Sequence, residues 1–200
     1  MRIFLGITGG SGAPYAARLL EALAGAGAEV GVCASSAALE VIATELYGDA
    51  RRSRDETLAR LTAGLEGVTI VDDRDWRSPY ASGSAKIDGY VICPCSMGTL
   101  GTIATGGSQN LIHRAASVAL KEERKLIVCP RETPYSLIHL ENMVSLKRAG
   151  GTILPLSPGF YAGAETIADL VDFVVARILD QLGVENTLVP RWGEPAAEQA

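Results

Sequence analysis

The sequence predicts an α/β protein built on a mostly parallel six-stranded sheet, and three observations support this fold class. Six short runs rich in Val, Ile and Leu are spread over residues 2–156. These runs show little alternation of apolar and polar residues, which is typical of strands covered on both faces. Helical patterns separate them, so the chain is expected to form successive β–α–β units with right-handed crossovers.

The bounds of the predicted strands and helices follow from the spacing of their apolar residues and from the glycine and proline residues that end them. The first helix stops near Gly27, the fifth at Gly150 and the sixth at Gly183. The loop over residues 72–86 is indicated by its Pro and Gly residues. The predicted strands are residues 2–8, 29–34, 68–72, 88–93, 125–129 and 152–156, and the predicted helices are residues 13–26, 37–47, 55–65, 110–124, 135–149 and 164–182.

Composition and charge narrow the functional class. The chain has 200 residues, of which 48% are hydrophobic and 20% charged, and this balance excludes wholesale disorder. We expect a single domain over residues 1–190, followed by a C-terminal tail over residues 191–200. The net charge of −5 argues against a general nucleic-acid or membrane-surface binder. Residues 85–150 are nevertheless net basic, which suits a small anionic ligand better than a polyanion.

The cysteines and histidines do not form a metal-binding pattern. Cysteines at 33, 93, 95 and 129 form no C-x-x-C pair, and the histidines at 113 and 139 are far from zinc-finger spacing. Buried free thiols in a reducing compartment are the simpler interpretation. The N-terminal apolar run is too short for a signal peptide, and no stretch approaches the length of a membrane span. We therefore expect a cytoplasmic protein without a metal.

Small, hydroxylic and charged residues follow the predicted strands at one edge of the sheet. Ligands of open parallel α/β sheets bind outside the carboxyl ends of the strands. One such loop is an ordinary turn, but five at one edge indicate a ligand pocket. These loops are TGGSGAP (8–14), SS (35–36), PCSMGT (94–99), PRETP (130–134) and SPGFY (157–161).

The first of these loops resembles a dinucleotide fingerprint without satisfying it. The pattern that starts at Gly10 and Gly12 requires Gly or Ala at position 15, where Tyr15 stands. Ser35 and Ser36 occupy the place of the acidic residue that binds a ribose in such sites. Hydroxyl groups and free amides at a helix N-terminus favour a phosphate. The pattern indicates a mononucleotide such as FMN rather than NAD, with a ligand-free glycine turn as the alternative.

A second group of residues is basic. Arg114 and Lys121 are seven residues apart on one predicted helix, and neither has a carboxylate three or four residues away. Cations beside an apolar face without a local partner need an external one. Arg131 follows the fifth strand, whereas Arg177 has Asp180 as a local partner. Together with a phosphate site, these cations favour a second, phosphate-bearing substrate; taken singly, each is equally well explained as a solvated surface charge.

Four further residues have two interpretations each. Glu132 is a candidate for proton transfer or a structural salt bridge. Ser11 is a candidate hydrogen-bond donor to a flavin or phosphate, or the N-cap of a helix. Tyr161 and Trp192 are candidate aromatic walls of a pocket, or ordinary packing residues.

Several long motifs occur in order along the chain: GITGGSGAPYA (6–16), SGSAKIDGYVICPCSMGTLGTIATG (82–106), NLIHRAASVALKEERKLIVCPRETP (110–134), LENMVSLKRAGGTILPLSPGFY (140–161), DLVDFVVARILDQLG (169–183) and PRWGE (190–194). In this combination the chain closely resembles the UbiX family of flavin prenyltransferases. The resemblance spans nearly the whole chain and is weakest over residues 47–75. No single motif would specify the family.

The resemblance implies a Rossmann-like or flavodoxin-like three-layer sandwich that assembles into a homododecamer with active sites where subunits meet. It implies transfer of a dimethylallyl group from dimethylallyl monophosphate to N5 and C6 of reduced FMN, without a metal. It further implies that the product, prenylated FMN, serves UbiD-type decarboxylases, with a place in ubiquinone biosynthesis.

The resemblance also implies roles for residues of this chain. Ser11, Glu45, Lys121, Glu132 and Trp192 are the implied catalytic residues, with Glu45 near the flavin ring and Trp192 near the prenyl chain. The implied FMN-binding residues are Gly10, Ser11, Ser35, Ser96, Met97, Gly98, Thr99 and Arg131. The implied prenyl-phosphate-binding residues are Arg114, Lys121, Arg131, Glu132, Tyr161 and Arg177.

Two alternatives remain beside the prenyltransferase hypothesis. A flavin-dependent decarboxylase of the Cys-decarboxylase type would share the fold, but the region CPCSMGTLGTIATGGSQN lacks the PASANMNT-like run of that family. A non-catalytic FMN carrier would leave Arg114, Lys121 and Arg177 as surface charges, so that replacing them would change nothing.

Overall fold

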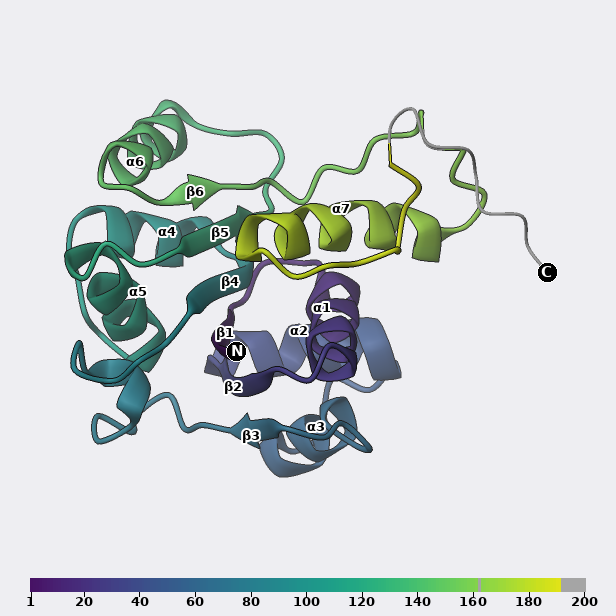
Figure 1. The fold of residues 1–200 in the computed structure, drawn as a ribbon, viewed down its shortest axis with the longest axis horizontal. Coiled ribbons are helices and arrows are strands. Elements are labelled where there is room, and N and C mark those ends of the chain that lie inside the picture. Colours follow the sequence, from purple (N-terminus) through teal and green to yellow (C-terminus); the bar gives the residue numbers. More distant parts are fainter. Residues whose placement is uncertain (162, 192–200) are drawn as a thin grey trace.

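The computed structural model describes residues 1–161 and 163–191 (Figure 1). The strands are β1 (Arg2–Ile7), β2 (Glu29–Ala34), β3 (Val68–Ile70), β4 (Gly89–Cys95), β5 (Leu126–Pro130) and β6 (Thr152–Ile153). The helices are α1 (Ala13–Gly25), α2 (Ser36–Tyr47), α3 (Arg54–Leu61), α4 (Met97–Ala104), α5 (Leu111–Lys121), α6 (Leu137–Arg148) and α7 (Ile167–Leu182), with a short 3₁₀ helix, η1, over Pro79–Ala81.

The six strands form one parallel sheet in the order β3-β2-β1-β4-β5-β6. The chain builds outward from β1 to β3, then returns to β4 on the other side of β1. The two neighbours at the centre, β1 and β4, therefore send their following segments to opposite faces of the sheet. This reversal point is where open α/β sheets place their ligands.

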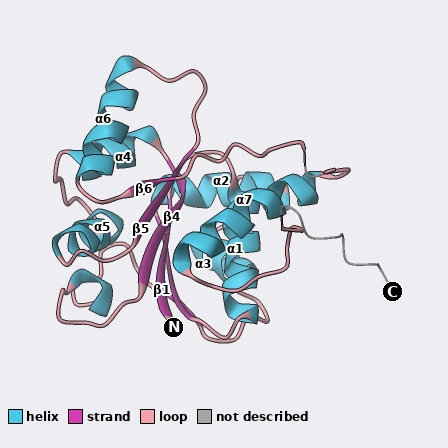
Figure 2. Ribbon diagram, turned by 45° about the horizontal axis from the view of Figure 1, so that its top comes forward, coloured by secondary structure: helices cyan, strands magenta, loops and turns pink. Residues whose placement is uncertain are grey.

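Helices cover both faces of the sheet, which Figure 2 shows nearly edge-on. One core lies under α1, α2, α3 and α7, where Leu19, Leu20 and Ile178 are fully buried. The other lies under α4, α5 and η1, where Leu100 and Leu111 are fully buried. Because both faces are covered, the strands carry near-continuous apolar runs. The predicted three-layer α/β fold is confirmed.

The structure adds one helix that the sequence pattern did not predict. Residues 97–104 form α4, although the prediction treated the start of this segment as a loop. Gly98 and Gly101 lower the intrinsic helix propensity of the segment. The helix forms because Ser96 caps it and because Met97, Leu100 and Ile103 are buried against the sheet.

All four cysteines are buried and free, as expected from their positions in the strands. Within the described part of the chain, no helix is both long and apolar enough to cross a membrane. Residues 1–161 and 163–191 also contain no group of three or more His, Cys, Asp or Glu placed to hold a metal ion.

Candidate functional site

The carboxyl ends of β1 and β4 are tied together by Thr8, the first residue after β1. Its buried hydroxyl donates to the Pro94 carbonyl at 3.0 Å and accepts from the Ser96 amide at 2.7 Å. The Thr8 amide donates to the same Pro94 carbonyl at 3.1 Å. These bonds fix the loop after β1 against the loop after β4, at the point where the sheet order reverses.

Arg131, the first residue after β5, joins the same two loops. Its backbone amide donates to the Cys95 carbonyl at 3.3 Å, and its side-chain Nε donates to the Ser11 carbonyl at 3.2 Å. Through its backbone and its half-buried side chain, Arg131 thus ties the start of the segment after β5 to the end of β4 and to the loop after β1. It also places a permanent positive charge at this edge of the sheet.

Serine side chains cap two helices whose N-termini open at this edge. Ser35 accepts from the Ala38 amide at the start of α2, and Ser96 accepts from the Thr99 amide at the start of α4, each at 3.3 Å. Beside this cap Met97 is buried, whereas an added Cβ on Gly98 would meet open space. Helix N-termini with free amides and hydroxyls attract anions. The first turns of α2 and α4 are thus available to a phosphate.

The loop after β1 lacks bulky side chains and packs closely on the end of β4, with Gly10 and Gly12 buried. A Cβ on Gly10 would lie 3.4 Å from the Cys95 carbonyl oxygen, so Gly10 packs directly on the end of β4. Gly12 has a φ of 126°, which favours glycine. The N-cap of α1 is Gly12 and not Ser11, whose side chain makes no hydrogen bond with another described residue. The Ser11 hydroxyl is therefore not used as a cap, and it is the Ser11 carbonyl that accepts from Arg131.

Glu45 occupies the N-terminus of α1. Its carboxylate Oε2 accepts from the Gly12 amide at 2.9 Å and from the Ala13 amide at 2.8 Å. A carboxylate at this position satisfies two amides that the helix leaves unpaired and complements its dipole. The anion site at α1 is thus filled by the chain itself, which directs an external phosphate to α2 or α4.

We expect Glu45→Ala to weaken FMN binding about tenfold and to lower the stability by about 1–2 kcal/mol, since it removes two charge-assisted bonds from the β1–α1 turn. Glu45→Gln keeps an acceptor oxygen, so its FMN affinity and its stability should lie between those of Glu45→Ala and the native chain. Titration with FMN and thermal unfolding measure both effects, with Glu40→Ala on the same helix as the control. An FMN affinity equal to that of the control would show that the turn does not depend on Glu45.

The two cations of α5 lie along the loop that contains η1. Arg114 Nε donates to the Ala81 carbonyl at 2.9 Å and forms no salt bridge within the described residues. The expectation that Lys121 lacks a local carboxylate is wrong, because its ammonium pairs with Glu122. The i,i+3 and i,i+4 rule does not cover this pair, because the two residues are adjacent in the sequence; Lys121 ends the helix and Glu122 is its C-cap. Lys121 nevertheless remains 48% exposed.

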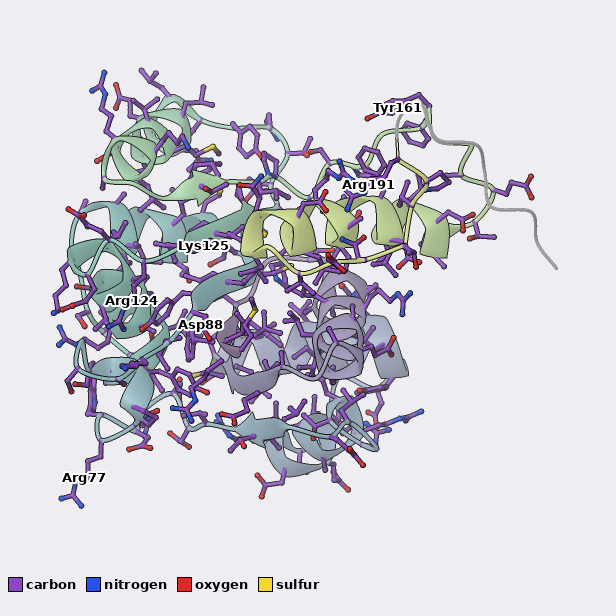
Figure 3. All side chains as sticks on the ribbon, in the orientation of Figure 1. Arg77, Asp88, Arg124, Lys125, Tyr161 and Arg191 are labelled. Carbon is purple, nitrogen blue, oxygen red and sulfur yellow. The ribbon has the colours of Figure 1, made fainter. Side chains whose placement is uncertain are left out.

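Lys121 lies at the opposite end of the sheet from Arg131. It precedes the amino end of β5, where its neighbours Arg124 and Lys125 also lie (Figure 3), whereas Arg131 follows the carboxyl end. The five residues of β5 span about 16 Å at ~3.3 Å per residue. One chain therefore does not bring Lys121 and Arg131 to the same small anion.

The remaining predicted cation and aromatic residues lie on or beside α7. Arg177 pairs with Asp180 at 2.9 Å, as the sequence indicates. The Tyr161 ring packs edge-on against Phe173, with ring centroids 5.6 Å apart. Trp192 lies outside the described residues. A single chain thus places the predicted residues in three groups: the carboxyl edge of the sheet around Arg131, the outer side of α5 and the outer side of α7.

Glu132 follows Arg131 directly and is half-buried. Its Oε1 accepts from the adjacent Thr133 amide at 3.1 Å. It forms no salt bridge with any described residue, so the structural alternative for this carboxylate has no support within one chain. Glu132 is thus a carboxylate without a cationic partner among the described residues, next to Arg131 at the carboxyl edge of the sheet.

The thiols and the buried histidine near this edge are held neutral. Burial raises the pKa of Cys95 and of Cys129 well above the ordinary thiol value, so neither supplies a thiolate at neutral pH. Burial lowers the pKa of His113, whose Nδ1 accepts from the Gln109 amide at 3.3 Å. His113 thus accepts a hydrogen bond from the loop before α5 through a neutral ring.

Comparisons with known proteins find relatives along nearly the whole chain. A family model described as Flavoprotein matches residues 1–179. Among curated proteins, the flavin prenyltransferase UbiX of Pseudomonas aeruginosa is 49% identical over 197 residues, covering 96% of this chain and 94% of the relative.

Two solved structures are also similar to this chain. One is AnUbiX (PadA1) in complex with FMN and dimethylallyl pyrophosphate, with a TM-score of 0.86 and 35% identity over 98% of each chain. The other is a dodecameric FMN-dependent UbiX-like decarboxylase from Escherichia coli O157:H7, with a TM-score of 0.86 and 39% identity, covering 97% of this chain and 100% of that one.

Proposed function

This chain belongs to the UbiX family of flavin prenyltransferases, and from this premise we propose how its residues perform the reaction of the family. The chain is an enzyme that joins a dimethylallyl group to N5 and C6 of reduced FMN, giving prenylated FMN. The proposal assigns FMN to the loops that follow β1, β2, β4 and β5, here called the flavin edge. It assigns the prenyl phosphate to a cationic site that more than one subunit completes.

The observation that carries the FMN assignment is the bridge made by Arg131 between three strand ends. The residues present fit a mononucleotide, because Gly98 leaves open space at the start of α4 and the N-termini of α2 and α4 offer amides and hydroxyls. In this arrangement Ser35, Ser96 and Thr99 hold the phosphate and ribityl groups. Gly10, Ser11, Met97, Gly98 and Arg131 line the ring.

Arg114, Lys121, Arg177 and Tyr161 bind the phosphate of the prenyl donor in this proposal. Breaking an allylic C–O bond leaves negative charge on the phosphate, and monophosphate is a poorer leaving group than diphosphate. Fixed cations and hydroxyl donors stabilise this developing charge. Lys121, Arg177 and Tyr161 are exposed and Arg114 is half-buried, on two outer sides of the subunit, which suits a site completed by neighbouring copies.

The flavin supplies the electron-rich atoms that the allylic group joins. Residues of the flavin edge hold these atoms against the donor, which provides proximity. Trp192 and the flavin face stabilise the developing allylic charge through cation–π attraction, worth about 0.5–2 kcal/mol per contact. Bond formation at C6 releases a proton, and Glu132, Ser11 and the departing phosphate are the candidate acceptors.

The assembly and the product's destination belong to the same proposal. A dodecamer is supported by the E. coli neighbour, which is described as dodecameric. Transfer of prenylated FMN to a UbiD-type decarboxylase follows from the family resemblance. Location in the cytoplasm is supported by four buried cysteines that are all free.

The product mass tests the proposed activity against both alternatives. FMN-loaded protein, reduced under anaerobic conditions and mixed with dimethylallyl monophosphate, should give a flavin heavier by one C5 unit. A parallel reaction with dimethylallyl pyrophosphate, the compound named for AnUbiX, decides the donor. Unchanged flavin with both donors would favour an FMN carrier, and release of CO₂ from a peptidyl cysteine would favour the decarboxylase.

A further inference from the structure

One carboxylate on α7 receives two guanidinium groups. Arg191 forms a two-pronged contact with Asp180, through NH1 to Oδ2 at 2.9 Å and NH2 to Oδ1 at 2.8 Å. Arg177 reaches the same Oδ2 at 2.9 Å, and the Asn186 side chain donates to Oδ1 at 3.2 Å. The hydrogen bonds from Arg191 are the largest cause of the lowered pKa of Asp180, so this carboxylate is ionised at neutral pH.

The cluster leaves Arg177 with unused binding capacity. Asp180 carries one negative charge and faces two positive ones, and Arg191 occupies both of its oxygens. Within the described residues, Arg177 has no other ion pair or hydrogen bond, and its side chain is 46% exposed. A guanidinium has five N–H donors, so most of those of Arg177 remain open to an external anion.

The cluster lies on the face of α7 that carries Tyr161. Phe173, Arg177 and Asp180 are spaced i, i+4, i+7 and therefore form one stripe along the helix. Tyr161 packs on Phe173 at one end of this stripe, and Arg191 binds Asp180 at the other. Figure 3 labels Tyr161 and Arg191 on the same side of α7. The stripe thus connects Tyr161 and Arg177, which are assigned to the prenyl phosphate, with Asp180 and Arg191, which have no assigned role.

We propose that Asp180 and Arg191 are positioning residues for the prenyl phosphate, a proposal that rests on the function proposed above. Asp180 fixes the orientation of the Arg177 guanidinium. Arg191 balances the negative charge of Asp180. Arg177 is therefore held in place by Asp180 and still contributes a net positive charge to the phosphate site. Without Arg191, Asp180 and Arg177 form an ordinary i,i+3 ion pair whose charges cancel, and the phosphate loses a cation.

Charge compensation tests this proposal. Arg191→Gln should raise both the KM and the calorimetric Kd for dimethylallyl monophosphate about tenfold, the effect expected for loss of one charge-assisted contact. The Kd for FMN should stay unchanged. Adding Asp180→Asn to Arg191→Gln removes the neutralising carboxylate and should return the Kd to within about threefold of the native value. If the bridge were purely structural, the second substitution would not restore the donor affinity.

The bridge between Arg18 and Asp172 provides a matched control on the same helix. Arg18 Nε and NH2 contact the two oxygens of Asp172 at 2.6 and 3.3 Å. Arg18→Gln should lower thermal stability as Arg191→Gln does, but leave the Kd for the donor unchanged. Equal donor affinities in Arg191→Gln and Arg18→Gln, or no rescue by Asp180→Asn, would overturn the proposal. If the donor Kd values followed this pattern but the native enzyme made no heavier flavin, the proposed function would be wrong and the proposed anion-binding site would still be supported.

Discussion

Lys121→Ala is expected to lower kcat/KM for the prenyl donor about 10²–10³-fold, the usual effect of removing one donor that stabilises developing negative charge. FMN affinity should not change, because Lys121 lies at the amino end of β5, about 16 Å from the flavin edge at ~3.3 Å per residue. Steady-state kinetics with dimethylallyl monophosphate and an FMN titration measure the two quantities separately.

Glu122→Gln is the matched control for Lys121→Ala. It breaks the same exposed ion pair but keeps the ammonium, and such pairs contribute only about 0–1 kcal/mol to stability. It should therefore retain near-native kcat/KM. Loss of FMN from Lys121→Ala would show that Lys121 binds FMN and not the prenyl donor. An equal loss of kcat/KM in both variants would show that the ion pair, and not the ammonium itself, is responsible.

Glu132→Gln is expected to slow turnover about 10²–10⁴-fold, the usual contribution of a general base, with little change in donor or FMN affinity. The amide oxygen of Gln still accepts from the Thr133 amide, so the loop geometry is retained. Single-turnover rates under anaerobic conditions report the chemical step, and equilibrium titrations report binding.

The exposed Glu141 on α6 supplies a control of the same type. Glu141→Gln should turn over at the native rate. A native rate in Glu132→Gln as well would remove Glu132 from proton transfer and leave Ser11 or the phosphate as the acceptor.

The positions of the flavin-edge residues were predictable because topology alone brings them together. Parallel strands end at one edge, so Ser11, Ser35, Ser96 and Arg131 had to lie along it once the strands were recognised. The contacts among them were not predictable, because they depend on backbone atoms such as the Ser11 and Cys95 carbonyls.

Other features depend on tertiary contacts that no local pattern encodes. The helix period gives Arg177 and Asp180 as partners, but Arg191 reaches Asp180 from beyond the turn at Gly183. Glu45 resembles any exposed glutamate of a helix until α2 packs beside α1. The helix α4 was missed because burial overrides the weak propensity of its glycines.

The distribution of cations over separate faces of one subunit has a general consequence. A site assembled from several copies exists only in the oligomer, so catalysis and assembly are coupled. Variants that disrupt assembly should lose prenyl transfer even when every residue of the site is intact.

Mixed oligomers test most directly whether one subunit's flavin edge works with another subunit's Lys121. Arg131→Ala and Lys121→Ala chains, each inactive alone, are co-expressed with different tags and purified as hetero-oligomers. Random assembly of a shared site should restore about a quarter of native activity per site, and native chains mixed with the double variant should also give about a quarter. No activity in the first mixture and about half in the second would place Lys121 and Arg131 of one chain in the same site and contradict the account.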